Sequence, residues 1–174
     1  QWRLGCQVRV RENMEIHIPA QVLGVKKWEC EVISNRNVAS FIKEFVIQLP
    51  PGEKLDFRSG GYVQIDVPPV TVDFSKDIAI DELFREDWSS LGIWGLKMVN
   101  KEYSFRAYSM ANHPAEGNRI MLNVRIATPP WDRSRGTFMK VNPGICSSYI
   151  FSRKPGDKVM ISGPFGEVFL KETQ

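Results

Sequence analysis

The chain is poor in the residues that build disulfide frameworks and metal centres. It contains three cysteines and two histidines among 174 residues. The cysteines, Cys6, Cys30 and Cys146, are odd in number and form no CxxC pair, which argues against a disulfide scaffold and favours a reducing compartment. His17 and His113 stand alone, so the sequence predicts no metal site, and each histidine is expected to be exposed or satisfied locally.

Long apolar runs and a strong charge of one sign are also missing. No run approaches the roughly 18 apolar residues of a membrane helix, and no signal peptide is visible, so no direct membrane insertion is expected. The net charge of +3 comes from 23 basic and 20 acidic residues, too small and scattered an excess for nucleic-acid binding. With 43% hydrophobic residues, the chain can form a packed core, as one large domain or one domain plus a fragment.

What the sequence does contain is a series of short alternating stretches typical of half-exposed antiparallel strands. They are interrupted by turn-rich breaks, including Asn35-Arg36-Asn37 and residues 163–166, and by a long loop over residues 128–142. The stretches are residues 28–34, 41–49, 62–67, 105–110, 120–127 and 158–162, with a further one at 167–170. We predict an all-β, mainly antiparallel fold: a six-stranded Greek-key-type β-barrel.

Residues 70–105 break this rhythm and are predicted to form a partly helical insertion on the barrel wall. Residues 81–88 begin with acids, as the helix dipole prefers, and fit one or two helical turns. The acidic residues are expected on a solvated face. Trp88 and Trp94 are interpreted as packing residues, in preference to a contact surface for another protein chain.

The first candidate site is the run Arg106, Ala107, Tyr108 and Ser109. On a strand, Arg106 and Tyr108 project to one face and the other two to the opposite face. A guanidinium can grip a pyrophosphate, a phenol ring can support a fused heterocycle, and a hydroxyl can bond its edge. The alternative is an ordinary exposed strand.

The second candidate site is the turn of Gly144, Ile145, Cys146, Ser147 and Ser148, which leads into a short apolar helix. The first N–H groups of a helix have no partner within it and point outward, so this end attracts anions. A serine hydroxyl can add to that site. The alternative is simple helix capping by serine.

These motifs resemble the FAD-binding domain of the ferredoxin–NADP reductase superfamily, in which an Arg-x-Tyr-Ser strand and a later Gly-x-x-Ser turn hold the flavin. The resemblance extends through residues 143–151, 154–158 and 162–166. Residues 24–30, 60–65, 106–112 and 123–130 are similar, more closely, to the family formed by the F subunits of bacterial sodium-translocating NADH:quinone oxidoreductases.

The resemblance implies a role for each matched residue. Arg106 would contact the FAD pyrophosphate, Tyr108 would pack on the isoalloxazine ring, and Ser109 would lie near flavin N5, where hydride arrives; Ala107 belongs to the same motif. The neighbouring strand would contribute Asn123, Val124 and Arg125. The short helix would wrap the pyrophosphate with Gly144, Ile145, Cys146 and Ser147, Cys146 being a packing residue more than a redox thiol.

The resemblance also implies a larger protein. Residues 1–27 would be the tail of a truncated [2Fe–2S] ferredoxin domain plus linker, with Cys6 a possible single remaining iron–sulfur ligand, and residues 28–174 the FAD-binding barrel. The NADH-binding domain would be absent. NADH and the [2Fe–2S] cluster would then act only in the full-length protein, one component of a membrane complex, anchored at the cytoplasmic side of the bacterial inner membrane.

Two rival interpretations remain at this stage. One is the FAD domain of another ferredoxin-reductase-like electron-transfer protein, such as an oxygenase reductase. The other is a non-catalytic β-barrel binding module. Binding of FAD separates the second rival from both flavoprotein interpretations.

Overall fold

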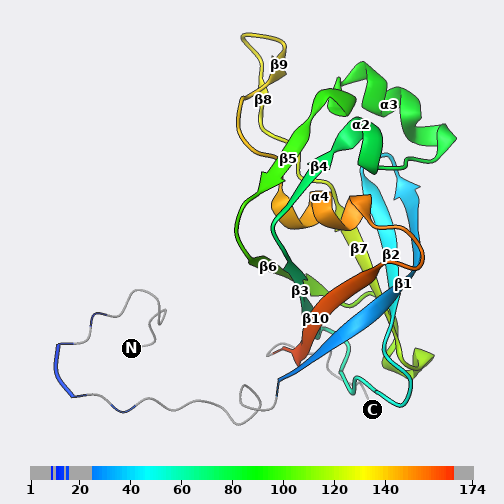
Figure 1. Cartoon of the computed structure of the whole chain (residues 1–174), viewed down its shortest axis with the longest axis vertical. Coiled ribbons are helices and arrows are strands. Elements are labelled where there is room, and N and C mark those ends of the chain that lie inside the picture. The colour runs from blue at the N-terminus through cyan, green and yellow to red at the C-terminus, as the bar shows by residue number, and fades with distance from the viewer. Residues whose placement is uncertain (1–8, 10, 14, 16–24, 167–174) are drawn as a thin grey trace, which may run out of the picture.

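The computed structural model describes residues 9, 11–13, 15 and 25–166. Its main sheet has six strands in the order β6-β3-β10-β1-β2-β7, and every neighbouring pair is antiparallel. The strands are β1 (Lys26–Ala39), β2 (Ile42–Gln48), β3 (Tyr62–Val67), β6 (Ser104–Ser109), β7 (Arg119–Arg125) and β10 (Lys158–Phe165). Figure 1 shows them curling around a common interior, which confirms the predicted mainly antiparallel, barrel-like fold. The six described strands do not close into a complete ring of paired strands, because β6 and β7 form no ladder.

The first hairpin corrects one prediction. Residues 35–37 were expected to form a turn, but β1 runs straight through them to Ala39, and the turn lies at residues 40 and 41. Bulges interrupt the β1–β2 ladder on either side of this stretch. Two of these polar side chains form hydrogen bonds with residues far away in the sequence. Asn35 Nδ2 donates to the Ile150 carbonyl, and Asn37 Oδ1 accepts the Asp81 N–H.

The insertion between β3 and β6 is a small unit of its own. It contains the two-stranded sheet of β4 (Val70–Asp73) and β5 (Lys97–Asn100), with short helical turns between them. These turns are α2 (Phe74–Asp77), η2 (Glu82–Phe84), α3 (Arg85–Ser90) and η3 (Ile93–Gly95). The predicted helical acids are exposed, and the Trp88 ring is fully buried between Phe74, Trp94 and Phe151. Packing is therefore the role of Trp88, as predicted.

Three further short elements lie outside the main sheet and the insertion. The turn η4 (Pro114–Glu116) connects β6 to β7, and a small hairpin of β8 (Trp131–Asp132) and β9 (Thr137–Phe138) projects beside the insertion. Residues 128–142 were predicted as a plain loop, so this hairpin is new. Residues 163–166 were predicted as a tight turn, yet β10 continues through residues 163–165, pairing Phe165 with Tyr62. The expected strand at 167–170 lies outside the described residues.

The helix α4 (Ile145–Ser152) lies across the barrel, in contact with β3, β6 and β7 on one side and with β4, β5 and α2 on the other (Figure 1). Cys146 through Ser152 are all buried. Such an all-round buried helix is part of the core. Because α4 touches the barrel and the insertion together, it joins the two.

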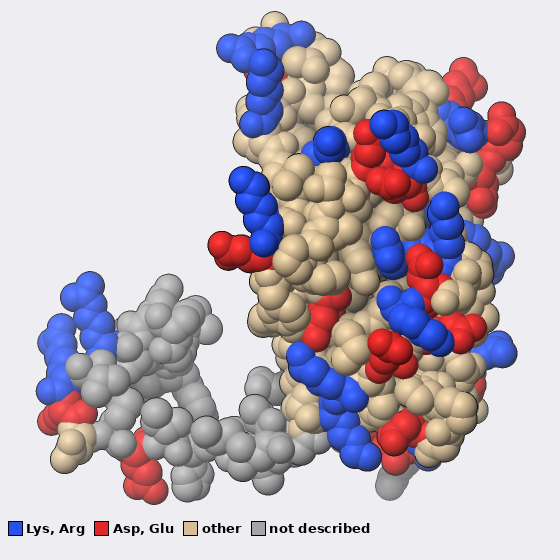
Figure 2. Space-filling model, viewed as in Figure 1, with Lys and Arg blue, Asp and Glu red and all other residues tan. Residues whose placement is uncertain are grey.

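The surface carries mixed charges. Figure 2 shows basic and acidic side chains interspersed over the visible face of the body, with basic side chains at the tip of the β8–β9 hairpin. None of the described helices is long and apolar enough to cross a membrane.

Candidate functional site

The barrel has an open seam between its two outer strands, β6 and β7. At one end the seam is fastened: the Ala111 N–H donates to the Met121 carbonyl at 2.8 Å, and the Met121 N–H donates to Asn112 Oδ1 at 2.9 Å. Continuing this register would pair Ser109 with Asn123 and Ala107 with Arg125. The described structure contains no such ladder. We call this unpaired stretch of the seam the opening, and the candidate site residues of both strands flank it.

The β6 side of the opening presents Arg106 and Tyr108. In the β3–β6 ladder they lie opposite Ile65 and Val63, two fully buried residues, so both point to the barrel side of the sheet. Ala107 and Ser109 point to the other face, as the sequence predicted. Arg106 is exposed, and its Nη1 donates to the Phe105 carbonyl at 2.7 Å. Among the described residues, no carboxylate forms an ion pair with Arg106.

Tyr108 links β6 to the beginning of α4. Its phenol is half-buried and faces the Cys146 thiol, and Arg106 lies on the same face of β6. Burial raises the pKa of the Tyr108 phenol well above its usual value, and the neighbouring thiol adds to the rise. Burial also raises the pKa of Cys146 to about 11. Cys146 is thus a neutral packing residue beneath the tyrosine, as predicted, and it is poorly suited to redox chemistry.

The first turn of α4 is fastened to the chain that leaves β7. The Gly144 N–H donates to the Ala127 carbonyl at 2.8 Å, and the Ala127 N–H donates to Ser147 Oγ at 3.1 Å. A Cβ on Gly144 would lie 2.6 Å from Ala127 Cβ and 2.8 Å from Ser147 Oγ, so only glycine fits this approach. The sequence did not identify Ala127 as a partner of this turn. Its small size at a position just after a strand was the only feature that could have indicated the role.

The same geometry changes the interpretation of Ser147. Its hydroxyl was predicted as a ligand for pyrophosphate, but it is buried, accepts from Ala127 and donates to the Gly144 carbonyl at 3.2 Å. Ser148 also donates to that carbonyl, at 2.7 Å. In this arrangement both hydroxyls hold the turn together through the Gly144 carbonyl, and neither makes the side-chain cap hydrogen bond of the capping alternative considered above. The open donors are the first backbone N–H groups of α4, because the first helical bond begins at the Ser148 N–H.

The β7 side of the opening presents residues of two kinds. Asn123 and Arg125 are exposed on the outer face, and Arg125 makes no hydrogen bond or ion pair with any described residue. Val124 is fully buried opposite Lys43, so only its backbone is available to a ligand. The structure therefore brings the predicted residues of β6, β7 and α4 around one opening but withdraws three side chains, Val124, Cys146 and Ser147, from its surface.

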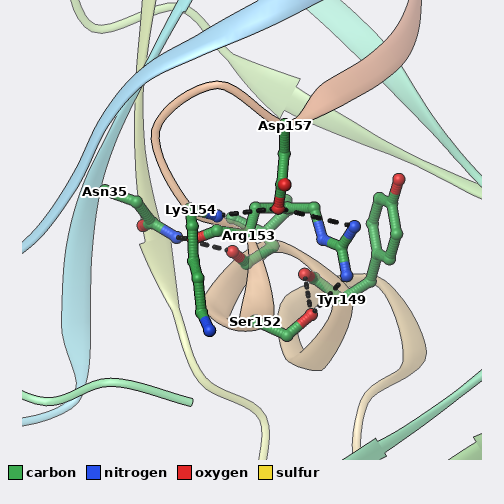
Figure 3. A network of polar contacts seen from close by, with 7 residues as sticks. Asn35, Tyr149, Ser152, Arg153, Lys154 and Asp157 are labelled. Atoms are coloured by element: carbon green, nitrogen blue, oxygen red, sulfur yellow. Dashed lines mark hydrogen bonds and ion pairs between the residues drawn. The ribbon is translucent and has the colours of Figure 1, made fainter. Parts of the chain in front are cut away.

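The far end of α4 is fixed by a polar network (Figure 3). Asn35 Nδ2 donates to the Ile150 and Arg153 carbonyls at 2.7 and 2.8 Å. The Ile150 carbonyl thereby gains a second donor beside the Arg153 N–H, and the Arg153 carbonyl, just after the helix, gains one. The Arg153 guanidinium lies over the Tyr149 ring and 3.7 Å from the Asp157 carboxylate, which also accepts the Lys154 N–H. With both ends held, the first turn of α4 is in a defined position beside the opening.

The other chemically active residues have structural roles or lie outside the described chain. Cys30 is fully buried in the core, where burial raises the pKa of its thiol to about 12. His113 caps η4 by accepting the Ala115 N–H at its Nδ1. The expected lone ligand Cys6 and His17 lie outside the described residues. Among the described residues, no group of three metal-binding side chains occurs.

Comparison with known proteins fits this geometry. Residues 93–170 match the oxidoreductase FAD-binding domain family, a segment that includes β6, β7 and α4. The chain is 59% identical over 171 residues to the F subunit of the Na(+)-translocating NADH-quinone reductase of Methylococcus capsulatus, covering 98% of this chain and 41% of that protein. It is 54% identical to the F subunit of the same reductase from Actinobacillus pleuropneumoniae, with 99% and 41% covered.

The chain is thus similar along almost its whole length to these F subunits, and its residues 93–170 match an FAD-binding domain. It spans about 41% of the length of these curated relatives. The solved structures that share the fold of this chain are more distant in sequence. The FAD/NAD-binding domain of nitric oxide dioxygenase from Vibrio cholerae has a TM-score of 0.55 at 21% identity, covering 84% of this chain and 47% of that one. The cytochrome b5 reductase domain of Ulva prolifera nitrate reductase has a TM-score of 0.53 at 17% identity, with 81% and 40% covered.

Proposed function

We propose that this domain binds FAD in the opening between β6, β7 and the first turn of α4. One observation carries the proposal: Tyr108, on β6, faces Cys146 in the first turn of α4, and Arg106 lies on the same face of β6 two residues away. An exposed cation, an aromatic ring and a helix N-terminus are thus brought to one place by segments nearly forty residues apart.

The residues present suit a dinucleotide. Arg106 and the first N–H groups of α4 would hold the pyrophosphate, since a guanidinium and a helix N-terminus both favour phosphate oxygens. Tyr108 would support the isoalloxazine ring, and Ser109 would lie near its N5 edge. Asn123, Arg125 and the backbone of Val124 would contact the flavin or the ribose from β7. Arg106 and Arg125 have no ion-pair partner among the described residues, so two cations are available to balance phosphate charge.

The names of the relatives support a role for this domain within a larger protein. FAD, when bound, supplies acceptance of a hydride and release of single electrons, while the domain's residues bind and orient it. We propose that the hydride comes from NADH and that the electrons pass to a [2Fe–2S] cluster on the way to quinone, in a sodium-translocating complex. Its partners would be the ferredoxin and NADH domains of the same polypeptide, with residues 1–27 the tail of that ferredoxin domain plus a linker. The other partners would be further proteins of a complex at the cytoplasmic face of the membrane.

Titration with FAD tests the proposal. The purified 174-residue chain is expected to bind FAD with a flavin absorbance band and quenched flavin fluorescence, and to show little oxidation of NADH. Arg106→Ala removes a charged hydrogen-bond donor and is expected to weaken FAD binding by about 1.5–3 kcal/mol, roughly ten- to hundredfold. Arg85→Ala is the control, since Arg85 lies over Trp94 in the insertion. A chain that binds no FAD, or equal affinities of the two variants, contradicts the assignment.

A further inference from the structure

The fastened end of the β6–β7 seam depends on one buried side chain, that of Asn112. It is 8% exposed, and its amide bonds two backbone groups of β7: Oδ1 accepts the Met121 N–H at 2.9 Å, and Nδ2 donates to the Arg119 carbonyl at 2.9 Å. In a regular antiparallel ladder, Met121 would instead bond the carbonyl of Ala111, which faces it. The side chain of Asn112 thus replaces the next step of the ladder.

Because the Asn112 side chain takes the place of a backbone hydrogen bond, the pairing of β6 with β7 ends where the candidate site begins. The last backbone bond across the seam is Ala111 N–H to the Met121 carbonyl, at 2.8 Å. Two residues further along each strand stand Ser109 and Asn123, which would be paired in a continuous sheet and are not. On the β3 side, β6 stays in register to its end, with the Met110 N–H donating to the Gly61 carbonyl at 3.0 Å. β6 is therefore held on one edge while its other edge leaves β7.

We propose that Asn112 is a positioning residue for the flavin, and this inference rests on the proposed FAD site. By clamping β7 to the end of β6, its amide sets the distance between Ser109 and Asn123, and hence the width of the opening that receives the flavin ring. Asn112 itself does not reach the ring. Its effect on FAD is transmitted through the β6 and β7 backbones.

The chain offers a matched control in Asn37. That residue is also 8% exposed, and its amide also joins two segments, accepting the Asp81 N–H at 3.3 Å and donating to the Ala39 carbonyl at 3.1 Å. It lies between the first hairpin and the insertion, away from the seam. Asn37→Ala therefore removes a comparable buried amide without touching β6 or β7.

The experiment compares the whole 174-residue chain with its Asn112→Ala and Asn37→Ala variants. Urea unfolding gives the stability, fluorescence titration gives the dissociation constant for FAD, and visible circular dichroism at saturating FAD reports the geometry around the flavin. Both variants are expected to lose similar stability. Asn112→Ala alone is expected to raise the dissociation constant about tenfold, the effect of one strong hydrogen bond, and to change the flavin circular dichroism.

The outcomes distinguish a failure of the positioning role of Asn112 from a failure of the proposed FAD binding. If the unaltered chain binds no FAD, both are overturned. If it binds FAD, but Asn112→Ala matches Asn37→Ala within twofold and leaves the dichroism unchanged, Asn112 is only structural. Should Asn112→Ala fail to fold, Asn112→Asp keeps the acceptor for the Met121 N–H and loses the donor to Arg119. That variant is expected to bind FAD more weakly than the unaltered chain, and equal affinity would overturn the inference.

Discussion

Buried polar side chains of this domain tie separate segments together, and they mark where single residues matter most. Lys43 points into the barrel from β2 and is 2% exposed. Its ammonium donates to the Ala79 carbonyl at 2.6 Å and to the Asn35 carbonyl at 3.4 Å, and it lies over the Phe151 ring. Burial lowers the pKa of Lys43 to about 8, although Asp81 opposes the shift.

Lys43 makes the stability of the fold depend on pH in a definite direction. The folded chain releases this proton near pH 8, whereas the unfolded chain keeps it until about pH 10.5, so stability rises with pH between the two values. Relative to Lys43→Met, the unaltered chain should gain up to about 2 kcal/mol from about pH 7.5 to about pH 9.5. Urea unfolding at several pH values measures this, and a constant difference between the two chains contradicts it.

Gly144 is the second residue at which a small change has a large expected effect. Its missing Cβ allows the contact with Ala127 that positions the first turn of α4. Gly144→Ala should cost about 1–3 kcal/mol of stability and also weaken FAD binding, because the added methyl pushes that turn away. Gly95→Ala is the control, since a Cβ there meets nothing within 4 Å. Thermal unfolding and FAD titration of both variants check the expectation, and equal behaviour would refute it.

The elements show how far sequence reasoning extends. Alternation identified the strands around residues 28–34, 41–49 and 62–67, because each strand has one buried and one solvated face. It failed at Asn35-Arg36-Asn37, where turn-forming residues sit inside β1. Their amides bond the end of α4 and the insertion, and such long-range partners cannot be identified from local pattern.

The location of the candidate site was predicted from its motifs. Which of its side chains are available to a ligand and which stabilise the fold was not predicted. The faces of Arg106 and Tyr108 follow from strand periodicity, and the structure agrees. Ser147 looks like a ligand in the sequence because a hydroxyl after a Pro-Gly turn suits both capping and phosphate binding. Only the position of Ala127, twenty residues away, reveals that this hydroxyl holds the turn. Asn112 could not be recognised for the same reason, since its partners lie on β7.

The insertion is attached to the barrel through α3 as well as through α4. Trp88 is fully buried, and its Nε1 donates to the Ser40 carbonyl, in the β1–β2 turn, at 2.6 Å. Trp88→Ala should cost about 3–5 kcal/mol, since it leaves a large cavity and an unpaired carbonyl. Leu83→Ala, at a side chain that is 83% exposed, should change stability by less than about 0.5 kcal/mol. Urea midpoints of the two variants provide the measurement, and similar midpoints would show that the insertion is loosely attached.

At the scale of the whole molecule, the barrel and the insertion share one helix. The first turn of α4 borders the proposed flavin opening, and the same helix contacts β4, β5 and α2. FAD at a hundred times its dissociation constant should stabilise the folded chain by about 2.7 kcal/mol. Amide hydrogen exchange should then slow in β4 and β5 as well as in β6 and β7. Slowing confined to β6 and β7 would show that α4 does not carry the effect.

This shared helix has a consequence for regulation. Thermodynamic coupling between two sites is reciprocal, so any factor by which FAD alters the affinity of the insertion for a partner equals the factor by which that partner alters the affinity for FAD. The insertion, although it lies apart from the flavin opening, is therefore a place from which the occupancy of the cofactor could be controlled.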